Sequence, residues 1–209
     1  MQKKEDIFFE LALQSNSLLL GDFTLKSGRR SPYFFNIGSF FNEGHIGKLA
    51  ELYAEVIQDN EIEFEVIFGP AYKGIPLAAA ISAIFSLKYS VSIPFAFDRK
   101  EEKSHGEGGS IVGELKDKRV LVIDDVLTAG TALKQSISTI NNYGGQVVGS
   151  LVALDREEIL EGVLARDKIF HGSNVEVMSI ARISQLIDFF NLSNRKEEAN
   201  IIKNYLTGL

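Results

Sequence analysis

The strongest constraint on the fold is a series of short, almost continuously apolar runs that begins at about residue 65 and alternates with longer segments of helical periodicity. The run over residues 120–123, Val-Leu-Val-Ile, is the most compact of them. A strand that is apolar at every position is covered on both faces, as in a parallel sheet with helices on either side. We therefore predict an α/β fold with a mostly parallel central sheet. Its ligand site is expected at the carboxyl ends of the strands.

The spacing of apolar residues also predicts the individual elements. Strands are predicted over residues 66–68, 91–96, 120–123, 146–154 and 175–180, after two short strands over residues 23–25 and 33–37. Helices are predicted over residues 5–19, 45–60, 75–87, 131–143, 156–164, 184–191 and 197–206. The length and the lack of a linker-like segment favour a single domain over residues 1–209.

Charge and composition exclude several functional classes. A formal net charge of −6 opposes general affinity for nucleic acids and for anionic membranes. The sequence has no cysteine, no apolar run long enough for a bilayer and no apolar signal segment near its N-terminus. We therefore expect a cytoplasmic protein whose partners are neither nucleic acids nor membranes.

The cations nevertheless gather in two short segments, which favours a small polyanionic ligand. The first segment contains Lys26, Arg29 and Arg30. The second contains Arg99, Lys100, Lys103 and His105. The second is polar, rich in glycine and too long for a tight connection, so a mobile lid is expected over about residues 98–113. Two solvated surface loops are the alternative interpretation.

Two adjacent carboxylates, Asp124 and Asp125, follow the apolar run. Burying them is costly unless they bind hydroxyl groups, a cation or backbone donors. The small residues Ala129 and Gly130 then lead into a predicted helix, whose N-terminus favours an anion. This combination suits a sugar phosphate, with its hydroxyl groups at the carboxylates and its phosphate in the loop. The structural alternative makes the acids strand-end residues and Thr131 a helix cap.

Two further segments have the composition of ligand-binding loops. Residues 68–76 join a predicted strand to a predicted helix through small residues, with Tyr72 and Lys73 near their centre. An ordinary turn punctuated by glycine and proline is the alternative. Residues 26–36 combine cations with aromatic rings, and Arg156 follows a predicted strand. Ring faces and a guanidinium group suit a flat, anionic base.

The apolar strand, the two acids and the string Thr-Ala-Gly-Thr over residues 128–131 resemble the signature that binds 5-phosphoribosyl 1-diphosphate (PRPP) in type I phosphoribosyltransferases. Together with the other segments, the chain resembles bacterial orotate phosphoribosyltransferases along essentially its whole length. The resemblance implies the type I fold, with a mostly parallel central sheet flanked by helices and a small N-terminal hood over about residues 20–40. It also implies a glycosyltransferase (pentosyltransferase) of pyrimidine biosynthesis, which converts orotate and PRPP into orotidine 5′-monophosphate and diphosphate.

The same resemblance assigns roles to individual residues. Catalytic roles are implied for Lys26, Lys103, His105 and Asp125. PRPP binding is implied for Lys26, Tyr72, Lys73, Arg99, Lys100, Lys103, His105, Asp124, Asp125, Val126, Leu127, Thr128, Ala129, Gly130, Thr131 and Ala132. Orotate binding is implied for Phe34, Phe35, Thr128 and Arg156. The peptide bond before Tyr72 is expected to be cis.

The resemblance also implies a cofactor and an assembly. Mg²⁺ is expected to act through PRPP oxygens and water, without a direct protein ligand. The enzyme is expected to be a homodimer with shared active sites, in which the lid and Lys26 serve the neighbouring subunit.

Three other interpretations remain open. The chain could be a phosphoribosyltransferase for a different base, which an assay with several bases would separate. It could be a PRPP-sensing regulator that binds RNA or DNA without turnover, although its net charge of −6 and its complete lid segment oppose this. A phosphate-binding module of unrelated fold would require all four segments to be coincidental.

Overall fold

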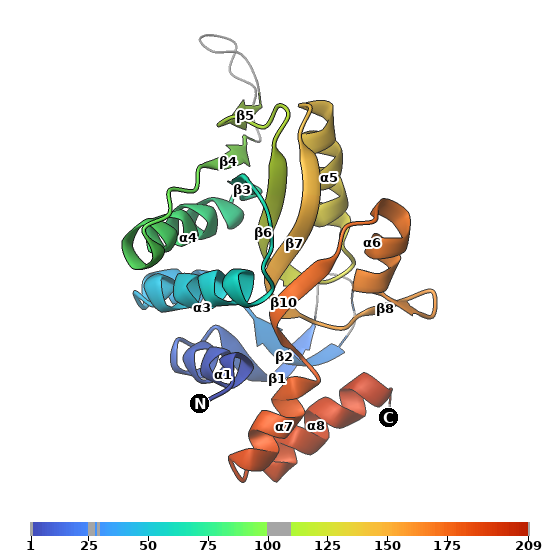
Figure 1. Cartoon of the computed structure of the whole chain (residues 1–209). Coiled ribbons are helices and arrows are strands. Elements are labelled where there is room, and N and C mark those ends of the chain that lie inside the picture. The colour runs from blue at the N-terminus through green and yellow to red at the C-terminus, as the bar shows by residue number, and fades with distance from the viewer. Residues whose placement is uncertain (1, 25–27, 29, 100–109, 209) are drawn as a thin grey trace. The chain divides into compact units, whose positions relative to one another are not determined.

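The computed structural model describes residues 2–24, 28, 30–99 and 110–208. The chain divides into two compact units, one of Met1–Leu49 with Ala181–Leu209 and the other of Ala50–Ile180. Four residues with predicted roles lie outside the described residues: Lys26, Lys100, Lys103 and His105. Figure 1 shows the order of the elements in each unit.

The second unit is built around a six-stranded sheet with the order β10-β7-β6-β3-β4-β5. Its strands are β3 (Val66–Phe68), β4 (Phe95–Asp98), β5 (Ile111–Val112), β6 (Arg119–Leu127), β7 (Gln146–Asp155) and β10 (Val177–Arg182). Its helices are α3 (Ile46–Asp59), α4 (Gly74–Tyr89), α5 (Thr131–Asn142) and α6 (Ala165–Ser173). The pairs β3–β4, β3–β6 and β6–β7 are parallel, and β4–β5 is antiparallel. The predicted α/β fold with a mostly parallel central sheet is confirmed.

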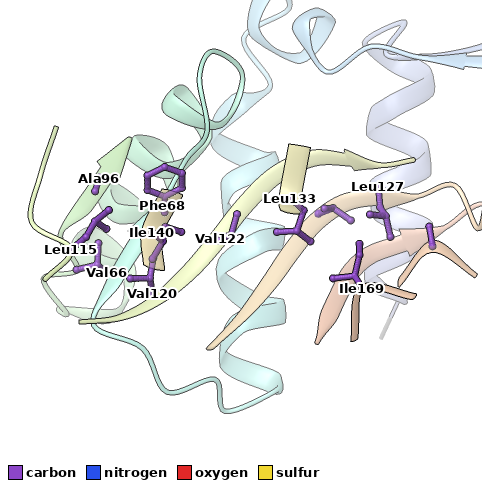
Figure 2. Close-up of a cluster of buried hydrophobic side chains, with 12 residues drawn as sticks. Val66, Phe68, Ala96, Leu115, Val120, Val122, Leu127, Leu133, Ile140 and Ile169 are labelled. Atoms are coloured by element: carbon purple, nitrogen blue, oxygen red, sulfur yellow. The ribbon is translucent and has the colours of Figure 1, made fainter. Parts of the chain in front are cut away.

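Helices cover both faces of this sheet, with α3 and α4 on one side and α5 and α6 on the other (Figure 1). This explains why β6 begins with the apolar run over residues 120–123, in which every side chain is buried. Figure 2 shows part of the resulting core, where strand side chains pack with helix side chains. The labelled members include Val66, Phe68, Val120, Val122, Leu133, Ile140 and Ile169.

The path of the chain through the sheet reverses between β3 and β6. β3 is followed by β4 on one side of this boundary, and β6 is followed by β7 on the other. β3 ends at Phe68, which pairs with Val122, while β6 continues to Leu127 beside β7. The last residues of β6 therefore extend past β3 at the switch in strand order, where parallel sheets bind ligands. The predicted strand over residues 120–123 was too short, because the ladder with β7 continues through the two acids.

The first unit packs helices against a two-stranded antiparallel sheet. Its elements are α1 (Lys4–Gln14), β1 (Leu18–Thr24), β2 (Arg30–Phe35), α2 (Gly38–Asn42), α7 (Gln185–Leu192) and α8 (Lys196–Thr207). Its core is aromatic, since the ring centroid of Phe8 lies 5.9 Å from that of Phe35 and 6.2 Å from that of Phe40. The predicted helix over residues 5–19 was too long. Asn16 adopts a left-handed conformation (φ 52°), which ends the helix and turns the chain into β1.

The largest error of the sequence prediction lies in residues 156–164, which form a hairpin instead of a helix. Its strands are β8 (Ile159–Leu160) and β9 (Val163–Leu164). Glu161 and Gly162 connect them with φ values of 55° and 83°, the backbone that a tight two-residue hairpin turn requires. The helix of this region, α6, begins only afterwards and was not predicted, and neither were α2 and β5. The strands predicted over residues 91–96 and 175–180 begin earlier than the observed β4 and β10.

None of the helices within the described residues is long and apolar enough to cross a membrane.

The turn after β3 depends on two glycines that approach each other closely. A Cβ atom added to Gly69 would overlap the carbonyl oxygen of Gly74 and lie 2.9 Å from the Cβ of Ala78. The Gly74 oxygen is a backbone atom and the Ala78 Cβ is attached directly to the backbone of α4. Neither atom can rotate away, as the end of a flexible side chain could. The entry into α4 is therefore fixed by the absence of side chains at these two positions.

We predict that Gly69→Ala lowers the free energy of unfolding by about 2 kcal/mol or more, since the added methyl group must displace the start of α4. Urea denaturation measures this change. Gly172→Ala in α6 is the matched control, because an added Cβ there meets no atom within 4 Å. It should leave the stability unchanged or raise it by up to about 1 kcal/mol. Equal stabilities of the two variants would contradict the close approach of Gly69 and Gly74.

Candidate active site

The acidic pair lies near the carboxyl end of β6 and is joined to the loop after β3 by an ion pair. Lys73, the residue before α4, donates from its Nζ to the Oδ2 of Asp125 over 2.8 Å. The Asp125 carboxylate is largely buried, whereas the Lys73 side chain is half exposed. A buried carboxylate of this kind requires a partner, because its desolvation is otherwise unfavourable. The ion pair therefore brings together two predicted PRPP-binding residues, one in the loop after β3 and one in β6.

Asp124 is the more strongly perturbed of the two acids. Burial raises its pKa to about 7, and the nearby charge of Asp125 adds to this rise. Two interactions act in the opposite direction: the Asp125 backbone N–H, which donates to the Asp124 Oδ1 over 2.8 Å, and the charge of Lys73. Asp124 therefore exchanges a proton near neutral pH.

Tyr53 of α3 contacts the backbone of the acidic pair through its hydroxyl group. It was not predicted as a site residue. Its side chain is fully buried, and its hydroxyl donates to the backbone carbonyl oxygen of Asp124 over 2.7 Å. Burial and the charges of Asp125 and Asp124 raise the pKa of Tyr53 well above its usual value, against a hydrogen bond from the backbone of Ala153 in β7. The hydroxyl therefore remains protonated and connects α3 with β6 and β7. In the sequence, Tyr53 is one of several apolar-face residues of a helix, so its polar contact leaves no recognisable pattern.

The loop after β6 presents the backbone of a helix N-terminus. Thr128 and Ala129 are exposed, and α5 begins at Thr131 without a side-chain cap. Gly130 has a left-handed conformation (φ 75°), and a Cβ atom at this position would overlap the Cδ1 of Ile169 from α6. The first N–H groups of α5 and the helix dipole favour an anion here. The backbone of this loop thus suits the predicted binding of phosphate. The Leu127 side chain lies in the core, so only its backbone can face a ligand.

The loop over residues 68–76 has the predicted peptide geometry, because the bond between Ala71 and Tyr72 is cis. The backbone N–H of Ala71 donates to the Oδ1 of Asp98 at the end of β4, over 2.6 Å. The Tyr72 side chain is exposed. At the base of the predicted lid, the N–H of Arg99 donates to the carbonyl oxygen of Ser110 over 2.6 Å. Tyr72 and Lys73, which are predicted to bind diphosphate, therefore follow β3, and Arg99 follows β4. The predicted ribose-binding acids lie near the end of β6.

The end of β7 brings Arg156 beside the phosphate loop. The register of the parallel pair sets Leu127 of β6 against Asp155 of β7, and the Arg156 N–H donates to the carbonyl oxygen of Leu127 over 3.1 Å. Thr128 and Arg156, two predicted orotate-binding residues, are thus neighbours across the ends of two adjacent strands. Arg166 of α6, which was not predicted, donates from Nη1 to the Oδ2 of Asp155 over 2.6 Å.

The other two predicted orotate residues, Phe34 and Phe35, lie in the first unit on β2. Successive residues of a strand face opposite sides. The Phe34 side chain is accordingly 40% exposed, whereas that of Phe35 is 8% exposed and packs against Phe8. Phe34 is available to a ligand in this unit. The orotate roles of both residues stay predictions, and the ring of Phe35 belongs to the aromatic core of this unit.

Residues 42–178 match the family model of the phosphoribosyl transferase domain. The chain belongs to the phosphoribosyltransferase family. Orotate phosphoribosyltransferase 2 of Saccharomyces cerevisiae is 45% identical, and the alignment spans 98% of this chain and 94% of the yeast chain. Orotate phosphoribosyltransferase of Methylococcus capsulatus is 42% identical over 98% of this chain and 97% of the bacterial one. The crystal structure of orotate phosphoribosyltransferase from Francisella tularensis has a TM-score of 0.86 and 37% identity, covering 97% of this chain and 98% of that chain. The predicted type I fold is confirmed by these matches.

In this phosphoribosyltransferase, the raised pKa of Asp124 predicts that the contribution of this residue to the free energy of unfolding falls as the pH rises. The folded protein holds the Asp124 proton up to a pKa of about 7, while the unfolded chain releases it at the ordinary value of 3.8. Stability is therefore lost as the pH rises from about 4 to about 7. Asp124→Asn keeps an acceptor oxygen for the Asp125 N–H but carries no charge. We expect it to be more stable than the wild type by on the order of 2 kcal/mol at pH 8, with a smaller difference at pH 5.

Denaturant titrations of both proteins between pH 5 and pH 8 test this prediction. Asp117→Asn in an exposed turn serves as the control, because Asn tolerates the left-handed conformation (φ 58°) of Asp117. Parallel stability profiles for the wild type and Asp124→Asn would contradict the assigned protonation.

Proposed function

We propose that this phosphoribosyltransferase transfers the 5-phosphoribosyl group of PRPP to orotate, which yields orotidine 5′-monophosphate and diphosphate. The reaction is a pentosyl transfer of pyrimidine biosynthesis. Relatives named orotate phosphoribosyltransferase, which match almost the full length of the chain, support this function. The structural observation that supports it is the register of β6 with β7, because it brings the proposed phosphate loop beside Arg156, whose guanidinium group can bind a carboxylate.

The donor site follows the chemistry of PRPP. The 5′-phosphate is assigned to the loop and helix start over residues 128–132, with Val126 and Leu127 contributing backbone, and the ribose hydroxyls to Asp124 and Asp125. Tyr72 and Lys73 lie on the loop that faces the leaving diphosphate. The cations Arg99, Lys100, Lys103 and His105 of the lid complete this side. Lys73 has to exchange its ion pair with Asp125 for the diphosphate when PRPP binds.

The acceptor site follows the chemistry of orotate, a flat ring that bears a carboxylate. Arg156 offers a charged donor for that carboxylate, and the Thr128 hydroxyl lies at the neighbouring strand end. Phe34 and Phe35 belong to the proposed hood of about residues 20–40, and we propose that they supply aromatic surface for the flat ring. The hood is proposed to be part of a single domain over residues 1–209. The acceptor therefore depends on residues that the phosphate loop alone does not specify.

The chemical step exchanges one bond at the anomeric carbon of ribose for another. The bond from this carbon to the diphosphate breaks, a bond to a ring nitrogen of orotate forms, and the proton of that nitrogen is released. Positive charge develops on the ribose, so positioning and electrostatics carry most of the acceleration. Asp125 is proposed to stabilise this charge through its carboxylate. Lys26, Lys103 and His105 are proposed to neutralise or protonate the departing diphosphate.

The residues of the site fit Mg²⁺ that is carried by the substrate. This ion prefers oxygen ligands and keeps several water molecules. Asp124 and Asp125 provide carboxylates at the sheet edge, and within residues 2–24, 28, 30–99 and 110–208 no cluster of three or more metal-binding side chains occurs. We propose contact through PRPP oxygens and water instead of a direct protein ligand. When bound, Mg²⁺ neutralises charge on the diphosphate.

We further propose a cytoplasmic homodimer with shared active sites. α4 supports this assembly, because its sequence is apolar on almost every side and leaves Leu87 84% exposed. A helix that is apolar all round is normally buried on several faces. A second copy of the chain is the partner that covers this surface in the proposal. The lack of cysteine supports the reducing compartment.

The function is tested by following orotate consumption by ultraviolet absorbance in the presence of PRPP and Mg²⁺. We expect turnover with orotate but not with uracil, adenine or hypoxanthine, and loss of activity with EDTA that added Mg²⁺ restores. Lys103→Ala should lower kcat by about 100-fold or more, because it removes a charge that balances the leaving group. Exclusive turnover of a purine would overturn the acceptor assignment, and RNA binding without release of diphosphate would overturn the enzymatic one.

Subunit mixing tests the shared sites. Lys26→Ala and Asp125→Ala are each expected to be inactive as purified homodimers. If Lys26 serves the neighbouring subunit, every heterodimer regains one complete site, and an equal mixture recovers about one quarter of the wild-type activity. Absence of recovery, with subunit exchange verified by mass spectrometry of differently tagged chains, would rule out this arrangement.

A further inference from the structure

The turn that follows β7 concentrates charges in a largely buried position. The charged residues are Asp155, which ends β7, and Arg156, Glu157 and Glu158 of the turn, and each of these side chains is at most 16% exposed. Buried charges are unfavourable unless they are paired in good geometry. These charges are paired, and the pairs connect the turn with the hairpin and with α6. The turn is therefore an ordered structure that fixes its side chains.

Arg156 is held at both its backbone and its side chain. Its N–H donates to Leu127 of β6, which fixes its position relative to the phosphate loop. Its Nε donates to the Oε1 of Glu158 over 3.2 Å, with side-chain exposures of 6% for Arg156 and 16% for Glu158. A guanidinium group is planar, so a bond to Nε fixes the direction of the whole plane.

Glu158 is itself fixed by the elements that follow. Its carbonyl oxygen accepts a hydrogen bond from the N–H of Ala165 at the start of α6, over 2.9 Å. The same turn is closed on its other side by Arg166, which donates to Asp155 over 2.6 Å, and by the Glu157 N–H, which donates to the Asp155 Oδ1 over 2.8 Å. These contacts hold the backbone of the turn, from which the Glu158 carboxylate reaches Arg156.

We propose that Glu158 is a positioning residue of the acceptor site, which orients the Arg156 guanidinium for the carboxylate of orotate. The inference rests on the proposed function, because it requires Arg156 to bind orotate. Long side chains lose considerable rotamer entropy when they are ordered, so an arginine that is already ordered binds its ligand more tightly. The carboxylate of Glu158 also offsets part of the arginine charge, so its role is to set direction and not to add attraction. Glu158 acts on orotate binding and leaves PRPP binding unchanged.

The central experiment measures KM for orotate and for PRPP separately. Glu158→Ala is expected to raise KM for orotate about tenfold and to leave KM for PRPP within about twofold. Glu158→Gln keeps an acceptor oxygen at the same reach, so it should restore KM for orotate to within about threefold of the wild type. Glu158→Asp keeps the charge but shortens the reach, so it should behave like Glu158→Ala. Glu161→Ala is the matched control, since Glu161 lies in the turn of the same hairpin and its side chain is 86% exposed.

A double-mutant cycle shows whether Glu158 acts through Arg156. In an Arg156→Ala background, adding Glu158→Ala should cause no further increase in KM for orotate. Additive effects would overturn the proposal, and so would an equal rise of both KM values or a KM for orotate within twofold of the wild type in Glu158→Ala. If Glu158→Ala fails to fold, Glu158→Asp and Glu158→Gln carry the comparison. If the wild-type protein does not turn over orotate, the proposed function is wrong. If the wild type is active and Glu158→Ala has an unchanged KM for orotate, only this inference is wrong.

Discussion

The ion pair between Lys73 and Asp125 is the interaction on which the arrangement of the proposed donor site depends. It connects the loop after β3 with the carboxyl end of β6, and thereby makes one site from two strand ends. Two carboxylates in succession would repel each other in a half-buried position. The lysine balances Asp125, and Asp124 keeps its proton near neutrality because burial raises its pKa. Tyr53 then fixes the backbone between β6 and α3 without adding a charge.

β6 is the element that converts sequence spacing into geometry. It extends beyond β3, so its acids lie near the carboxyl end of the strand with no pairing to β3, and it stays paired with β7 up to Asp155. The same strand therefore carries the two acids proposed to bind ribose, leads into the proposed phosphate loop and pairs with the strand that precedes Arg156. One register of hydrogen bonds therefore sets the proposed donor residues of β6 beside Arg156, a residue of the proposed acceptor site.

The sequence predicted the sheet and the loop between β6 and α5 well, because both depend on local patterns: continuous apolar strands, an acidic pair and small residues at a helix start. It failed over residues 156–164, where left-handed backbone at Glu161 and Gly162 makes a hairpin from a segment with helical spacing. It also missed Tyr53, whose hydroxyl meets a residue 71 positions away, and Arg166, which pairs with Asp155 across the hairpin. Such contacts depend on the tertiary structure, so no spacing rule reveals them. Phe34 and Phe35 show a third limit, since the alternation of a strand separates two neighbouring aromatics that composition treats as equal.

Asp124 carries a proton near neutral pH, so the proposed donor site can release a proton when a ligand binds. A ligand whose hydroxyl groups are bound best by two ionised carboxylates competes with this proton near neutral pH, because the pKa of Asp124 is about 7. Filling the site then releases a fraction of a proton into the solution. Part of the heat that accompanies binding therefore belongs to the buffer that takes up this proton, and the apparent enthalpy depends on which buffer is chosen. If the proposed substrate binds here, its affinity therefore depends on the pH of the solution through a single buried carboxyl group.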